Sequence, residues 1–148
     1  MHRIPVLRCC LVREGSHQTE TRSFKTAATA AAVLSAHLEG ADREHFVVIL
    51  LDSKNKGIGI NTVSVGSLNA CIVHPREVFK PAILVGANAI ILGHNHPSGD
   101  PTPSPEDVAV TVRIREVGRI LGIEVLDHVI VAPGGAYRSL REGDCTGW

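Results

Sequence analysis

The sequence predicts a single domain of the α/β (α+β) class, in which a mixed β-sheet is covered by helices. Strand-like apolar runs occur both before and after the helical segments, and several are joined by short turns. Such connections favour a mixed sheet over a purely parallel, doubly wound one. The chain has 148 residues, of which 44% are hydrophobic. That is enough to build one packed core without disulfides.

The first 65 residues are predicted to contain three strands and one helix. Ile4–Val12 reads as a strand, and the polar segment Glu14–Arg22 reads as a turn or hairpin. The Ala-rich segment Lys25–Glu39 lacks glycine and proline and stops before a glycine, as helices commonly do. Phe46–Leu51 is continuously apolar, as in a strand buried on both faces. Turn residues separate it from a further strand, Ile58–Val65.

The middle of the chain alternates between strands and a helix. Leu68–Val73 is predicted to be a strand, and His74–Glu77 opens a helix because Pro75 suits a first helical turn. Pro81 is expected to kink or restart this helix. Ala89–Gly93 follows as a short buried strand.

A proline-containing loop, His94–Pro103, precedes the helix with the strongest signals, Ser104–Leu121. That helix starts with a serine N-cap and a proline. The side chains of its predicted apolar face recur at helical spacing, and they are Val110, Ile114, Val117 and Leu121. Closing strands are expected at Ile123–Val131 and Ala136–Leu140, on either side of a Pro-Gly-Gly turn.

The composition disfavours several function classes. Lys+Arg and Asp+Glu are both 15, and only five residues are aromatic, so weak or no nucleic-acid binding is expected. The four cysteines, Cys9, Cys10, Cys71 and Cys145, form no C-x-x-C pair and read as free thiols. The longest apolar runs are too short to span a membrane and no signal peptide is recognisable. We therefore expect a cytoplasmic protein that does not bind membranes.

A candidate metal site lies at the junction between the loop and the last helix. His94 and His96 are two residues apart, so at a strand end both rings can face one ion. Asp107 is the third residue after the Ser104 cap, on the same helical face as the predicted core residues. Two imidazoles and one carboxylate leave a fourth position open, which is typical of catalytic zinc.

Each part of this pattern also has an ordinary explanation. A His-x-His pair is often a pair of plain strand or loop residues, and S-x-x-D is a common helix-capping arrangement. Their coincidence at one junction in an apolar setting favours the metal site. His74 and His128 have no ligand spacing to this cluster and are interpreted as structural histidines, whereas His2, His17 and His37 are expected at the surface.

The pattern H-x-H-x7-S-x2-D resembles the JAMM motif of the JAB/MPN metallopeptidase fold. The surrounding segments resemble the bacterial RadC family, and they are His74–Lys80, Gly93–Pro101, Pro103–Asp107 and Leu126–Ile130. The resemblance extends from about Lys25 to Glu142. Longer members of the family carry a helix-hairpin-helix region, in whose place this sequence has the strand-like Ile4–Val12.

The resemblance implies a cytidine-deaminase-like, three-layer JAB/MPN fold with one zinc ion per chain. It divides the chain into a strand or hairpin extension over residues 1–24 and a RadC-like domain over residues 25–148. It also implies a general-base glutamate on an early strand, for which Glu44 is the candidate and Glu77 the rival. Ser104 would stabilise the oxyanion of a tetrahedral intermediate.

Two functions from different classes follow. The first is a zinc-dependent metallohydrolase, a JAMM-type peptidase or isopeptidase acting on a peptide or protein. The second is a non-catalytic, metal-stabilised interaction module associated with DNA repair or mobile elements. An open groove above the metal would favour the hydrolase, and a groove plugged by the loop His94–Pro103 would favour the module. The sequence is compatible with a homodimer but does not settle the oligomeric state.

Overall fold

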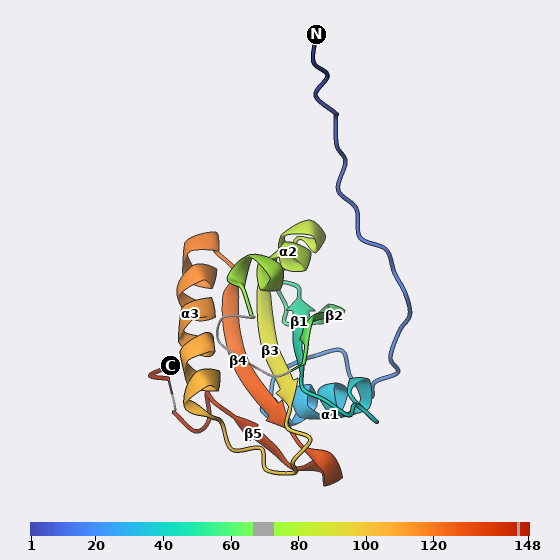
Figure 1. Cartoon of the computed structure of the whole chain (residues 1–148). Helices are drawn as coiled ribbons and strands as arrows, with labels where there is room; N and C mark the ends of the chain where they lie inside the picture. Colours follow the sequence, from blue (N-terminus) through green and yellow to red (C-terminus); the bar gives the residue numbers. More distant parts are fainter. Residues whose placement is uncertain (67–72, 145) are drawn as a thin grey trace.

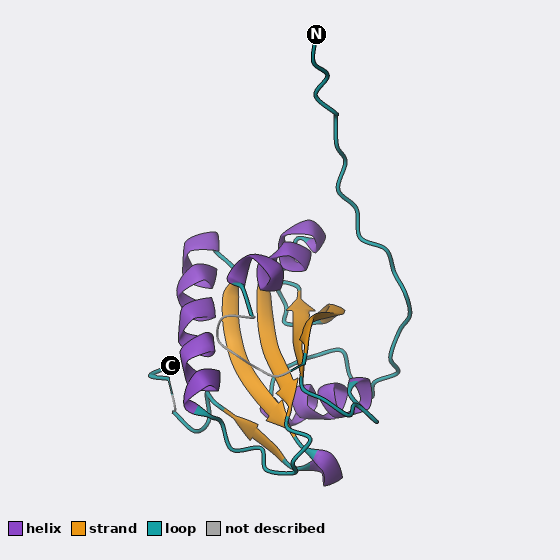
Figure 2. Ribbon diagram, in the orientation of Figure 1, coloured by secondary structure: helices purple, strands orange, loops and turns teal. Residues whose placement is uncertain are grey.

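The computed structural model describes residues 1–66, 73–144 and 146–148, and within them it contains a five-stranded sheet between helices (Figures 1 and 2). The strands are β1 (His45–Leu51), β2 (Gly57–Val65), β3 (Ala89–Asn95), β4 (Glu124–Val131) and β5 (Tyr137–Ser139). The helices are α1 (Ala27–His37), α2 (Pro75–Val85) and α3 (Pro105–Leu121), with a short 3-10 turn at Pro133–Gly135.

The sheet is mixed, as predicted. Its strand order is β2-β1-β3-β4-β5, and β1 pairs antiparallel with both β2 and β3. Only β3 and β4 pair in parallel within this described sheet, and α3 makes the crossover between them. The antiparallel strand β5 closes the edge beside β4. Strand β3 is therefore the central strand, and its carboxyl end lies where α3 begins.

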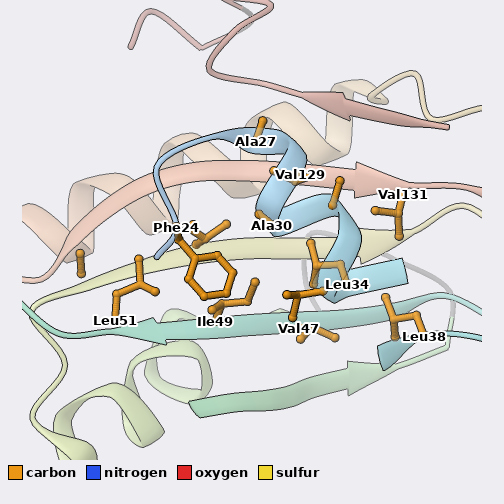
Figure 3. Packing of buried hydrophobic residues seen from close by; sticks show 14 residues of the cluster. Phe24, Ala27, Ala30, Leu34, Leu38, Val47, Ile49, Leu51, Val129 and Val131 are labelled. Atoms are coloured by element: carbon orange, nitrogen blue, oxygen red, sulfur yellow. The ribbon is translucent and has the colours of Figure 1, made fainter. Parts of the chain in front are cut away.

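Two apolar clusters make the fold three-layered. One lies between the sheet and α1, and includes Leu34, Val47 and Ile49 (Figure 3). The other lies between the opposite face of the sheet and helices α2 and α3, and includes Phe46, Phe79 and Ile114. Successive residues of β1 alternate between the clusters, which explains why a strand buried on both faces reads as one continuous apolar run.

The helices begin and end close to the predicted positions. Ser104 caps α3, and Gly122 ends it in a left-handed conformation with φ of 72°. Pro81 lies inside α2, which continues as a single element instead of restarting. Val110 and Ile114 are buried as expected, whereas Leu121, at the end of α3, is 44% exposed. The apolar face of α3 is thus shorter than its sequence pattern indicates.

The prediction of a first strand at Ile4–Val12 is wrong. These residues are exposed and form neither a strand nor a hairpin with Glu14–Arg22, and the segment runs away from the domain (Figure 1). An apolar run becomes a strand only when a neighbouring strand takes its backbone hydrogen bonds. The first sheet-like contact of the described chain is a single bridge between Ser23 and Lys56.

Two further predictions concern the strands on either side of α2. β3 extends through Asn95, so His94 belongs to the strand and the loop starts later than predicted. The predicted strand Leu68–Val73 lies, except for its last residue, outside the described residues.

Cys9 and Cys10 are exposed free thiols, while Cys71 and Cys145 are outside the described part. No helix in the described ranges is both long and apolar enough to cross a bilayer.

Candidate metal centre

Two histidines lie at the end of the central strand. His94 is the next-to-last residue of β3, and His96 follows the last one. Side chains two positions apart on a strand point to the same face, and here the two Nε2 atoms lie 2.9 Å apart. His94 is fully buried, whereas His96 is partly exposed. The spacing in the sequence therefore brings both rings to one point.

Asp107 reaches this point from the first turn of α3. The Ser104 backbone N–H donates to Asp107 Oδ2 at 2.7 Å, and the Asp107 N–H donates to Ser104 Oγ at 3.2 Å. This capping box fixes the carboxylate. Its Oδ1 lies 3.2 Å from Nε2 of His94, and its Oδ2 lies 3.4 Å from Nε2 of His96. The sequence left two alternatives for Asp107, a helix-capping role and a metal-ligand position, and the structure accommodates both.

One oxygen of Asp107 is buried without a hydrogen-bond donor among the described residues, namely Oδ1. Such atoms are rare because an unpaired buried acceptor costs about 1–3 kcal/mol. A metal ion would satisfy it, since ligand atoms about 2.0–2.2 Å from a tetrahedral ion lie roughly 3.3–3.6 Å apart. Here the two Nε2 atoms lie 2.9 Å apart, and each lies 3.2–3.4 Å from one of the two Asp107 oxygens, so small adjustments would admit an ion. His94, His96 and Asp107 could thus hold a metal ion.

The electrostatics of the cluster favour a cation. Burial by itself raises the pKa of the Asp107 carboxyl, but its short contacts with the His94 and His96 rings and the hydrogen bond from the Ser104 N–H together outweigh burial. The resulting pKa lies well below the ordinary range, so Asp107 is an anion at neutral pH. Its contact with His96 raises the pKa of that ring against the opposing effect of burial. A buried anion beside two imidazoles attracts a proton or a metal ion.

The orientation of the His96 ring suits a ligand. Its Nδ1 lies 2.8 Å from the backbone carbonyl oxygen of Asp100. Because a carbonyl can only accept, Nδ1 carries the proton of the neutral ring. The lone pair of Nε2 then points at His94 and Asp107.

A third histidine, which sequence reasoning left out of the site, contacts the cluster. Nε2 of His128, in β4, lies 2.8 Å from Nδ1 of His94. Thr111, on α3, in turn contacts His128. Thr111 follows Asp107 by four residues, a spacing that places both on one helical face and could have drawn attention to it. No sequence spacing links His128 to the other residues.

Glu44 and Ser104 line the same cavity as two of the three ligand candidates, His96 and Asp107. The antiparallel register pairs Phe46 with His94, which places Glu44, two residues earlier, level with His96. A cavity of about 310 Å³ opens there. Its lining residues are Glu44, His96, Ser98, Asp100, Thr102, Ser104 and Asp107. The loop after β3 forms one wall of this cavity, so it does not plug the site.

The rival glutamate lies elsewhere. Glu77 is exposed in the first turn of α2 and is not among the residues that line this cavity. The structure therefore brings Glu44 and Ser104 beside the ligand candidates and leaves Glu77 apart from them.

A mixed sheet between helices, with H-x-H at the end of a strand and an aspartate in the first turn of the next helix, defines a JAB-type domain. A family model described as a RadC-like JAB domain matches residues 24–145. Because that match covers most of the sequence, the chain belongs to the RadC-like JAB domain family.

Bacterial relatives that carry the name UPF0758 agree with this assignment. The chain is 56% identical over 127 residues to one from Caldanaerobacter subterraneus, which covers 86% of this chain and 54% of the relative. It is 62% identical over 101 residues to one from Desulfitobacterium hafniense, covering 68% of this chain and 44% of the relative. The chain thus spans about half the length of the curated relatives it matches.

Proposed function

We infer that this protein is a zinc-dependent hydrolase that cleaves amide bonds, either peptide or isopeptide, with one zinc ion per chain. The observation that carries this inference is the meeting of His94, His96 and Asp107, with one carboxylate oxygen lacking a hydrogen-bond donor, beside a cavity that Glu44 and Ser104 line. Membership of a JAB family adds support, because that domain type is usually hydrolytic.

Zinc fits the donor set better than other common ions do. Two imidazole nitrogens and one carboxylate oxygen are borderline ligands, whereas calcium and magnesium favour oxygen-only sites. Three protein ligands also leave one position for water or substrate, as catalytic zinc sites do. When bound, zinc would polarise the scissile carbonyl and make a water molecule easier to deprotonate.

Glu44 is the proposed general base. Its place in the cavity, level with His96, lets it take a proton from the attacking water as the new C–O bond forms. The same carboxyl then gives that proton to the leaving amine nitrogen as the C–N bond breaks. The products are a carboxylic acid and an amine, so no further reactant is needed.

Ser104 is the proposed donor to the developing oxyanion. Its Oγ accepts the Asp107 N–H, which uses a lone pair and leaves the hydroxyl proton available. Because the capping box holds Ser104 at the start of α3, that donor is oriented before the substrate binds. Such preorganised donors stabilise oxyanions by about 2.7–4 kcal/mol.

The test combines a substrate screen with three variants. The zinc-loaded protein is screened against peptide and isopeptide libraries, and zinc content and melting temperature are measured alongside. Glu44→Gln should keep zinc and stability while hydrolysis falls by about 10²–10⁴-fold, since a glutamine cannot accept the water proton. Asp107→Ala should lose zinc and hydrolysis together. Glu77→Gln is the matched control, because Glu77 is exposed and away from the cavity.

The outcomes separate the two functions. Parental activity in Glu44→Gln would exclude Glu44 as the base. Zinc binding without hydrolysis of any library member would favour the interaction module instead, and absence of zinc uptake would refute the metal site.

A further inference from the structure

A chain of hydrogen bonds joins two of the candidate ligands through residues that do not line the cavity. Nδ1 of His94 is 2.8 Å from Nε2 of His128. Nδ1 of His128 is 2.5 Å from Oγ1 of Thr111, and that hydroxyl lies 2.6 Å from the backbone oxygen of Asp107. His94, His128 and Thr111 are all fully buried. The chain therefore begins at one ligand candidate and ends at another.

Donor and acceptor roles along this chain can be assigned by starting from its final acceptor, the backbone carbonyl of Asp107. The Asp107 carbonyl can only accept, so the Thr111 hydroxyl donates to it and accepts from His128 Nδ1–H. A neutral imidazole has one N–H, which leaves His128 Nε2 as an acceptor. His94 must then donate from Nδ1, and its Nε2 lone pair faces His96 and Asp107. Full burial supports a neutral His128, because a charged ring would lose its hydration there.

An irregularity in the sheet puts His128 in this place. Ile90 pairs with Val125 and Ile91 with Asp127, so Leu126 is an extra residue that reverses the alternation of side chains along β4. His128 therefore faces α3, where its ring meets the Phe46 ring edge-on. The Asp127 carboxylate accepts hydrogen bonds from the His128 backbone N–H and from Ser139 Oγ, and the latter links β4 to β5.

We propose that His128 and Thr111 are positioning residues that fix the tautomer and orientation of His94 and so assemble the metal site before the ion arrives. This proposal rests on the metal binding proposed above. The chain joins ligands from separate elements, His94 on β3 and Asp107 on α3, through a third element, β4. Partners that orient a ligating histidine in this way raise its basicity and reduce the ordering required on binding.

The test replaces the Thr111 hydroxyl without changing the shape of the side chain. Thr111→Val removes the acceptor for His128 Nδ1–H, so His128 can turn its proton toward His94 and force that ring into the wrong tautomer. We expect zinc affinity, measured by competition with a chelator, to fall by about 10–100-fold. Thr111→Ser keeps the hydroxyl and should bind zinc within about 2-fold of the parent.

Ile114→Val is the matched control for packing. Ile114 is buried on α3 in the same apolar cluster, and this change removes one methyl group without touching a hydrogen bond. It should lower the melting temperature while leaving zinc affinity within about 2-fold of the parent.

The second readout needs no metal. Two-bond ¹H–¹⁵N spectra of the metal-free parent should show protons on Nδ1 of both His94 and His128, and Thr111→Val should change this pattern. A parent with the His94 proton on Nε2, or a Thr111→Val protein with parental zinc affinity, overturns the proposal. Failure of the parent to bind zinc refutes the metal site itself, whereas zinc binding without hydrolysis refutes only the hydrolase function.

Discussion

Gly93→Ala should destabilise the protein, although glycine is usually a poor strand residue. A Cβ atom at Gly93 would lie 2.5 Å from both Cδ atoms of Leu34 and 3.1 Å from its Cγ. Leu34, on α1, is fully buried in the cluster of Figure 3, so its packed neighbours oppose any shift of its side chain. Leu34, α1 or the central strand must therefore move.

The magnitude can be estimated from two opposing effects. Overpacking of a core by one methyl group costs about 1–3 kcal/mol. Replacing glycine reduces the entropy of the unfolded chain and returns about 0.4–1 kcal/mol. The free energy of unfolding should fall by about 1–2 kcal/mol net, which corresponds to a melting temperature lower by about 2–8 °C for a chain of this size. Zinc binding should persist, because the added methyl group would face α1, on the opposite side of the sheet from His94.

Thermal and denaturant unfolding followed by circular dichroism measure this effect. Gly59→Ala is the matched control: Gly59 is exposed on β2, and a Cβ there would come no closer than 3.4 Å to Leu50. It should be neutral or slightly stabilising. Leu34→Ala alone should cost about 2–5 kcal/mol, but less in the Gly93→Ala background because the new methyl enters the vacated space. A Gly93→Ala protein as stable as Gly59→Ala, or strictly additive costs, would refute the reasoning.

Two further results are expected. Removing zinc with a chelator should lower the melting temperature by about 5–10 °C. At free zinc about 100-fold above Kd, binding adds about 2.7 kcal/mol to the free energy of unfolding, and chelation removes it. Secondary structure should persist, and complete unfolding by the chelator would contradict this. The pKa of His37 is lowered by burial and then by His17 and His45, so the native state binds fewer protons than the unfolded chain. Stability should therefore decrease as pH falls through about 6.5, the ordinary value for histidine. An NMR titration should place the His37 midpoint below that value, and the His17→Asn variant should have a higher His37 midpoint. An unchanged midpoint in this variant would argue against the 2.8 Å contact between the His17 and His37 rings.

Local sequence determined much of this protein. The capping box at Ser104 and Asp107 depends on neighbouring residues, and so does the shared face of His94 and His96. Both follow from the repeat of a helix or a strand, which operates over a few residues. The mixed sheet could be predicted for the same reason, because apolar runs and turn residues mark its elements.

Contacts between distant elements could not be read from the sequence. The apolar segment Ile4–Val12 resembles a strand, but strand formation requires a partner and the described structure provides none. The sequence already favoured Glu44 over Glu77, but only the register of β1 against β3 places Glu44 level with His96. His128 reaches His94 because one extra residue in β4 reverses which side chains face α3. Pairing register and bulges depend on the whole sheet, so only the tertiary structure decides which histidine supports the site.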